Sequence, residues 1–111
     1  ERKGAAAFSL ECLGRTAAWP ADQGTMDLFR YWDEAARKID IQAIPIKRGG
    51  LSDANYLADL GPTLDGLGPT GANAHCSERS VGEGKVPEFV EPDSFVPKAV
   101  MNVLALHKLL G

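Results

Sequence analysis

The fold class of this chain depends first on residues 25–39, TMDLFRYWDEAARKI, which carry its strongest helix signal. Apolar side chains recur there at helical spacing: Leu28, Trp32, Ala35 and Ile39. A stripe of this kind predicts an amphipathic helix with one face on the core. The Thr25 hydroxyl suits the N-cap position because it can accept hydrogen bonds from the free N–H groups of the first turn.

Extended segments are predicted on both sides of this helix. Residues 5–13 alternate loosely between apolar and other side chains, which favours a strand. Residues 41–47 predict a second strand, in which Pro45 favours an edge or terminal position because proline cannot donate to a β ladder. Residues 62–65 predict a third, short strand.

Two further helices and one long loop complete the order of elements. A short helix is expected over residues 52–60, and residues 66–92 are predicted as loop. The last helix is expected to begin at Asp93 or Ser94. Its apolar face is predicted to carry Ala99, Val103, Leu106 and Leu110. Alternation of strands and helices in this order is typical of an α/β fold with sequential strands in one sheet.

Length and composition are those of one modest globular domain, with 111 residues, of which 44% are hydrophobic and 24% charged. The formal net charge is −3 and basic residues occur at most in pairs such as Lys47–Arg48, so nucleic acid is not an expected partner. No apolar run approaches the about 20 residues of a membrane-spanning helix, so no membrane partner is expected. Residues 1–7 do not resemble a signal peptide.

The two cysteines indicate the redox environment of the protein, and the first residues indicate whether the sequence is part of a longer chain. Cys12 and Cys76 are too few and too far apart for a disulfide framework. Free thiols in a cytoplasmic protein are therefore expected, with a bridge between the two as the alternative. The chain opens on Glu1 and enters a strand-like stretch at once, which suggests a piece of a longer protein.

A glycine pair between a predicted strand and a capped helix is one candidate ligand site. At Gly49 and Gly50 the backbone can approach a ligand closely, and the helix N-terminus that follows offers unpaired N–H groups to an anion. An ordinary strand-to-helix turn is the alternative. Asp65 also ends a predicted strand and is followed by glycines, at the kind of sheet edge where ligands of α/β proteins gather.

Two isolated basic side chains are further candidates. His75 lies within GPTGANAHCSER, residues 68–79, with no Cys-x-x-Cys or zinc-finger spacing around it. A lone loop histidine is more often an exposed polar group than a metal ligand. Arg15 offers the planar fork that pairs with a carboxylate, with a solvated surface charge as the alternative.

In combination and order, these segments resemble the C-terminal part of the zinc-dependent exopeptidase and deacylase superfamily. Its members include glutamate carboxypeptidase, acetylornithine deacetylase, succinyl-diaminopimelate desuccinylase and the carnosinase-like dipeptidases. The matching stretches are GRTAAWP at 14–20, GGLSDANYLADLG at 49–61, PTLDGLGPTGANAHCSE at 62–78 and the closing helix after EPDSFVPKA. The run GG-x-SDAN followed by PTLDGLGP-x-G-x-x-x-H is the specific part of the match.

The resemblance implies an α/β fold, namely the C-terminal portion of a phosphorylase/hydrolase-like, three-layer zinc peptidase catalytic domain. In such enzymes a smaller lid domain interrupts the catalytic domain and commonly mediates dimerisation. Residues 1–19 would then be the last strand of the lid and the return linker, and residues 20–111 the closing part of the catalytic domain. A homodimer formed through the lid is the implied assembly.

The resemblance also implies a site. His75 occupies the position of a zinc ligand, and Arg15 matches the arginine that binds the free carboxylate of the substrate. The backbone of the glycine turn lines the same pocket: Gly49, Gly50, Leu51 and Ser52. The intact enzyme would hold two zinc ions, with cobalt or manganese as alternatives. It would hydrolyse an amide bond beside a free carboxylate in a small peptide or an N-acyl amino acid, with a glutamate as general base.

The chain departs from the family pattern in ways that leave other functions open. Thr16 and not proline follows Arg15, Leu51 stands where several relatives have glycine or threonine, and residues 79–92 form a longer link than usual. Neither an H-x-D stretch nor a Glu-Glu pair occurs, so the other zinc ligands and the general base have no counterpart here. The chain alone is expected to be inactive. The alternatives are a non-catalytic binding module and an inert fragment that retains the fold.

Overall fold

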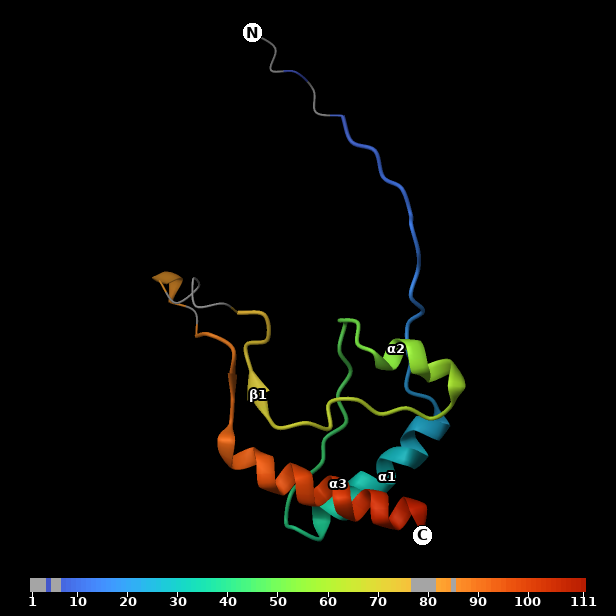
Figure 1. Ribbon diagram of the computed structural model, residues 1–111, viewed down its shortest axis with the longest axis vertical. Helices are drawn as coiled ribbons and strands as arrows, with labels where there is room; N and C mark the ends of the chain where they lie inside the picture. The colour runs from blue at the N-terminus through green and yellow to red at the C-terminus, as the bar shows by residue number, and fades with distance from the viewer. Residues whose placement is uncertain (1–3, 5–6, 77–81, 85) are drawn as a thin grey trace.

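The computed structural model describes residues 4, 7–76, 82–84 and 86–111 (Figure 1). In chain order its elements are α1 (Gln23–Arg37), α2 (Ala54–Leu57), the 3-10 turn η1 (Ala58–Leu60), β1 (Gly71–Ala72), β2 (Phe89–Val90), the 3-10 turn η3 (Pro92–Ser94) and α3 (Phe95–Leu110). Long irregular segments join them. Among these described helices, none has both the length and the apolar character that a membrane crossing requires.

Helix α1 confirms the predicted amphipathic helix but begins two residues earlier than expected. Its N-cap is Asp22, whose Oδ1 accepts from the backbone N–H of Thr25 at 2.7 Å. Thr25 is therefore not the cap and lies inside the first turn with only 6% of its surface exposed. The Asp22 carboxylate takes the N-cap role because it accepts from the Thr25 N–H, one of the first N–H groups that have no partner within the helix. At the other end, Ile41 N–H donates to Ala36 O at 2.9 Å and Asp40 takes a left-handed φ of 56°.

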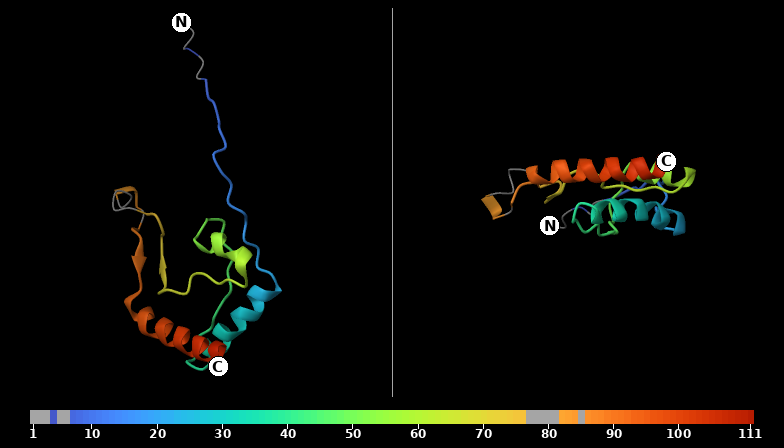
Figure 2. Two further views of the ribbon diagram at one scale, coloured as in Figure 1. Left: turned by 45° about the vertical axis from the view of Figure 1, so that its right-hand side comes forward. Right: turned by 90° about the horizontal axis from the view of Figure 1, so that it is seen from below.

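The core lies where α3 crosses α1 (Figure 2). Its buried side chains are Trp32, Ala35, Ala36, Met101 and Ala105. Ala36 and Ala105 have no exposed surface, since small side chains let the two helix backbones approach closely. Leu64 and Leu67 pack against this cluster from the loop that precedes β1. The predicted core stripe of α1 is confirmed, because Trp32 and Ala35 are buried and Leu28 and Ile39 pack against the cluster.

The predicted apolar face of α3 is wrong. Val103 is 65% exposed and Leu110 83%, and Ala99 and Leu106 are also exposed. The side of α3 that packs on α1 carries Met101 and Ala105 instead. Apolar residues occur on more than one side of this helix, so periodicity alone does not select the side that meets the small residues of α1.

Of the three predicted strands, none is formed by the described residues. Residues 7–13, 41–47 and 62–65 are irregular in the structure. Extended residues become a strand only when another strand accepts and donates their backbone hydrogen bonds, and the described part of the chain supplies no such neighbour. Residues 5 and 6 of the first predicted strand lie outside the described residues, as do 77–81 and 85 of the predicted loop. The three-layer α/β arrangement and the division at residue 19 stay predictions.

The only strand pair in the described residues lies within the predicted loop. β1 and β2 are antiparallel, with Gly71 opposite Val90 and Ala72 opposite Phe89. A Cβ placed on Gly71 would lie 2.3 Å from the Phe89 carbonyl oxygen, so the two backbones approach closely only because residue 71 is glycine. His75 follows β1 by three residues, and β2 leads through η3 into α3 (Figure 1).

Candidate functional site

The side chain of Asn55, the second residue of α2, links two segments that the sequence predicts to share a site. Its Oδ1 accepts from the backbone N–H of Ser52 at 3.0 Å. Its Nδ2 donates to the carbonyl oxygen of Ala17 at 3.0 Å. Asn55 is half-buried between them. The segment that carries Arg15 therefore lies beside the glycine turn, although 38 residues separate Ala17 from Asn55.

Ser52 extends this network to Asp65. The Ser52 Oγ accepts from Ala54 N–H at 3.3 Å. Hydrogen bonding by the Ser52 side chain is the largest cause of a lowered pKa at Asp65, and the Gly66 N–H, which donates to Asp65 Oδ1 at 2.6 Å, is the second. Both interactions favour the ionised carboxylate. A fixed negative charge thus stands beside the glycine turn, at the end of residues 62–65.

The other predicted members of the carboxylate pocket are exposed. Arg15 makes no ion pair with any described residue. Gly49 and Gly50 are outside the left-handed region of φ, and a Cβ placed on either would meet no described atom within 4 Å. Leu51 is 69% exposed. The turn therefore presents its backbone to solvent.

Helix α3 holds the loop that leads from Asp65 to His75. The Asn102 side chain donates to Leu67 O at 3.0 Å, and Lys98 Nζ donates to Gly66 O at 3.4 Å. Farther along, Ser94 Oγ accepts from Thr70 N–H at 2.8 Å and donates to Glu91 O at 2.6 Å. The glycine-rich loop thus has its backbone satisfied by side chains of one helix and its N-terminal turn.

Asn102 joins this loop to the core as well. The indole Nε1–H of Trp32 donates to Asn102 Oδ1 at 2.8 Å. The single amide therefore connects α1, α3 and the loop at Leu67. Sequence reasoning missed Asn102; the signal is a lone amide within the apolar run VMNVLAL of a predicted helix.

His75 is exposed, just beyond β1, with a left-handed φ of 68°. Histidine adopts this region at a cost of about 1 kcal/mol or more, so its surroundings must hold it there. Cys76 N–H donates to Asn73 O and Glu88 N–H to Cys76 O, both at 2.9 Å. These bonds fix the turn around His75. No hydrogen bond in the described part of the chain joins the imidazole to Arg15 or to residues 49–52.

The described residues do not by themselves form a metal centre. Among them, no three His, Cys, Asp or Glu side chains come close enough together to hold an ion. His75 alone fits the part of a single ligand, since the imidazole is accessible. Cys12 is exposed and Cys76 half-buried, and both are free, which confirms the expected thiols over the alternative bridge.

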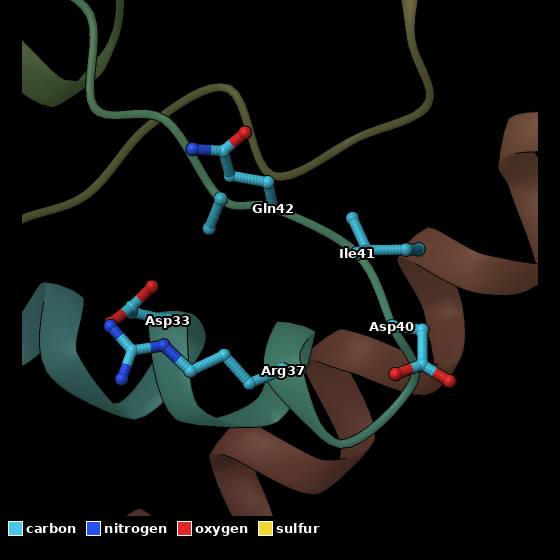
Figure 3. A pocket seen from close by; sticks show the side chains of 6 residues that line it. Asp33, Arg37, Asp40, Ile41 and Gln42 are labelled. Carbon is cyan, nitrogen blue, oxygen red and sulfur yellow. The ribbon is translucent and has the colours of Figure 1, made fainter.

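A concave surface at the C-terminal end of α1 lies apart from these residues (Figure 3). It is lined by Asp33, Arg37, Asp40, Ile41, Gln42 and Ala43. The Arg37 guanidinium is turned toward Asp33, and the two pair at 2.6 Å. With its one cation already neutralised and none of the predicted site residues in its lining, this surface offers no chemistry of its own.

Comparison with protein-family models, with curated proteins and with solved structures found no match to this chain. The resemblance to zinc-dependent exopeptidases and deacylases therefore stays a prediction, and with it the roles of Arg15, residues 49–52 and His75.

Proposed function

We propose that this chain supplies one zinc ligand and part of the substrate carboxylate pocket of a dinuclear zinc amidohydrolase. The reaction is cleavage of an amide bond next to a free carboxylate, as in a carboxypeptidase, a dipeptidase or an N-acyl amino acid deacylase. The observation that carries the proposal is the pair of hydrogen bonds through Asn55, which holds the Arg15 segment against the glycine turn.

In the carboxylate pocket, Arg15 and the turn have complementary tasks. The planar guanidinium donates two parallel hydrogen bonds to the substrate carboxylate. Backbone N–H groups of residues 49–51 donate to the same group, whereas the Ser52 N–H donates to Asn55 Oδ1. The absence of side chains at Gly49 and Gly50 lets the ligand approach. The pocket therefore orients the amide bond relative to the rest of the site.

His75 is the proposed zinc ligand of this segment. As a ligand it would be neutral, with its second nitrogen free to donate to an oriented acceptor. When bound, the metal pair supplies Lewis-acid polarisation of the amide carbonyl. Zinc is the proposed metal, with cobalt or manganese as substitutes, and the remaining ligands and the general base come from other parts of the protein. The proposed setting is a cytoplasmic homodimer formed through the lid domain.

The test compares His75→Ala with His107→Ala in the complete protein that carries this chain. His107 lies near the end of α3 and is exposed, so its loss controls for removal of an imidazole. The substrates are N-acetyl derivatives of glycine, methionine, glutamate and ornithine, with zinc or cobalt supplied. We expect His75→Ala to lose most hydrolysis and part of the bound zinc, measured by elemental analysis, while His107→Ala keeps both.

Two results would contradict the proposal. If His75→Ala keeps wild-type hydrolysis and metal content, His75 is not a ligand. If the wild-type protein binds these compounds without hydrolysing them, the chain belongs to a non-catalytic binding module instead.

A further inference from the structure

We infer that Asn55 is the positioning residue of the carboxylate pocket, because its one amide sets the place of Arg15 relative to the glycine turn. This inference rests on the proposed function and deepens it. The ligands concerned are N-acyl amino acids and peptides with a free α-carboxylate. Asn55 does not touch the substrate; it acts through the two groups that do.

The planar amide of Asn55 makes a hydrogen bond at each of its two ends. Oδ1 accepts from Ser52 N–H and Nδ2 donates to Ala17 O, each at 3.0 Å. Since the donor and the acceptor of a carboxamide are fixed relative to each other, the two bonds together fix the distance between the segment at Ala17 and the turn at Ser52. No other amino acid of this size both donates and accepts in this way.

The segment that carries Arg15 depends on this bond. In the described part of the chain, Asn55 to Ala17 is the one hydrogen bond between residues 7–20 and the remainder. Arg15 lies two residues before its anchor, and most neighbouring side chains are exposed. Without the anchor, the guanidinium would have to be ordered at the moment of binding, at a cost in conformational entropy.

The turn side of the amide is held in its own right. The Ser52 hydroxyl accepts from Ala54 N–H, and the Ser52 side chain also hydrogen-bonds to Asp65. These two bonds continue to hold the turn when Asn55 is replaced. Two substitutions therefore separate the two bonds. Asn55→Asp keeps an acceptor for Ser52 N–H but cannot donate to Ala17 O, whereas Asn55→Ala removes both bonds.

The experiment measures kcat and KM in the complete zinc-loaded protein for the four N-acetyl amino acids and for their carboxamide counterparts. We expect Asn55→Ala to raise KM for the acids about 2- to 10-fold, the range that corresponds to one hydrogen bond, with kcat changed less than about twofold. The amides lack the carboxylate and should show no such increase. Gln42→Ala, which removes an exposed amide from the surface beyond α1, is the matched control.

The Asn55→Asp substitution removes the bond to Ala17 O and also adds a negative charge. A double-mutant cycle that combines a substitution of Asn55 with Arg15→Ala separates the loss of the bond from the effect of the charge. If Asn55 acts through Arg15, the double variant has the KM of Arg15→Ala alone. A second readout needs no catalysis: trypsin should cleave after Arg15 faster in Asn55→Ala than in the wild type or in Gln42→Ala.

The outcomes distinguish this inference from the proposed function. If the wild type hydrolyses the acids but Asn55→Ala leaves KM unchanged, lowers only kcat, or adds fully to Arg15→Ala, the positioning role is overturned and the proposed function stands. If no zinc-dependent hydrolysis occurs, the proposed function fails and the pocket fails with it. Unchanged trypsin cleavage would by itself refute the anchoring of Arg15.

Discussion

Replacement of Asn102 by alanine should destabilise the fold at the junction of its two long helices and the loop that leads to His75. Asn102→Ala removes two hydrogen bonds, one from Trp32 Nε1 at 2.8 Å and one to Leu67 O at 3.0 Å. Trp32 is 6% exposed, so its indole N–H would be left with little access to water.

The size of the loss follows from these contacts. Each hydrogen bond contributes about 0.5–1.5 kcal/mol net, and an unsatisfied buried donor costs about 1–3 kcal/mol. The higher helix propensity of alanine returns roughly 0.5 kcal/mol. We therefore expect the free energy of unfolding to fall by about 2 kcal/mol.

The assay is urea unfolding followed by circular dichroism at the helix band, with Gln42→Ala as the control for loss of a surface amide. A cycle with Trp32→Phe isolates the indole bond, and we expect a coupling of about 1 kcal/mol. A loss below about 0.5 kcal/mol, or a coupling indistinguishable from zero, would refute the view that Asn102 holds the loop to the core.

Two further predictions concern the loop itself. Gly71→Ala should separate β1 from β2, because its Cβ would lie 2.3 Å from Phe89 O. The control Gly68→Ala meets nothing within 4 Å and should be neutral. The measurement is hydrogen exchange at the Glu91 amide, which donates to Thr70 O at 2.8 Å and should exchange faster only in Gly71→Ala. The pKa of Asp65 in the folded chain lies below its ordinary value of 3.8, chiefly through hydrogen bonding by Ser52. The stability that this carboxylate contributes is therefore complete above its unfolded pKa and is lost as the pH falls through the folded pKa. The wild type should exceed Asp65→Asn in unfolding free energy at pH about 5, and the difference should shrink toward pH about 2; a constant difference would contradict the linkage.

Helices α1 and α3 and the short helix at α2 were predictable because their signals are local. The stripe of Leu28, Trp32, Ala35 and Ile39 predicts α1 without reference to the rest of the chain. In the structure α1 is a helix, and these side chains lie in the core or pack against it. The cap was misplaced by three residues, since Asp22 and Thr25 both suit an N-cap and only the geometry of the turn distinguishes them.

For the candidate site, the sequence indicates which residue types could bind a ligand but not how they are arranged in space. Glycines, an arginine and a histidine in loops indicate ligand binding, yet Asn55 becomes a link only when Ala17 lies next to it. The same holds for the strands: alternation marks residues 41–47 as suited to a sheet, but hydrogen bonds from another strand are needed to make one.

The sequence by itself determined the positions of the helices and the residue types available to a site, because helix periodicity and turn chemistry depend on neighbours within a few residues. Only the tertiary structure decided which side of α3 meets α1, that Gly71 pairs with Val90, and that Asn55 joins Ala17 to Ser52. Apart from the bond between Asn55 and Ser52, these contacts join residues that are far apart in the sequence. Their energy depends on shape and on hydrogen-bond partners that no local pattern specifies.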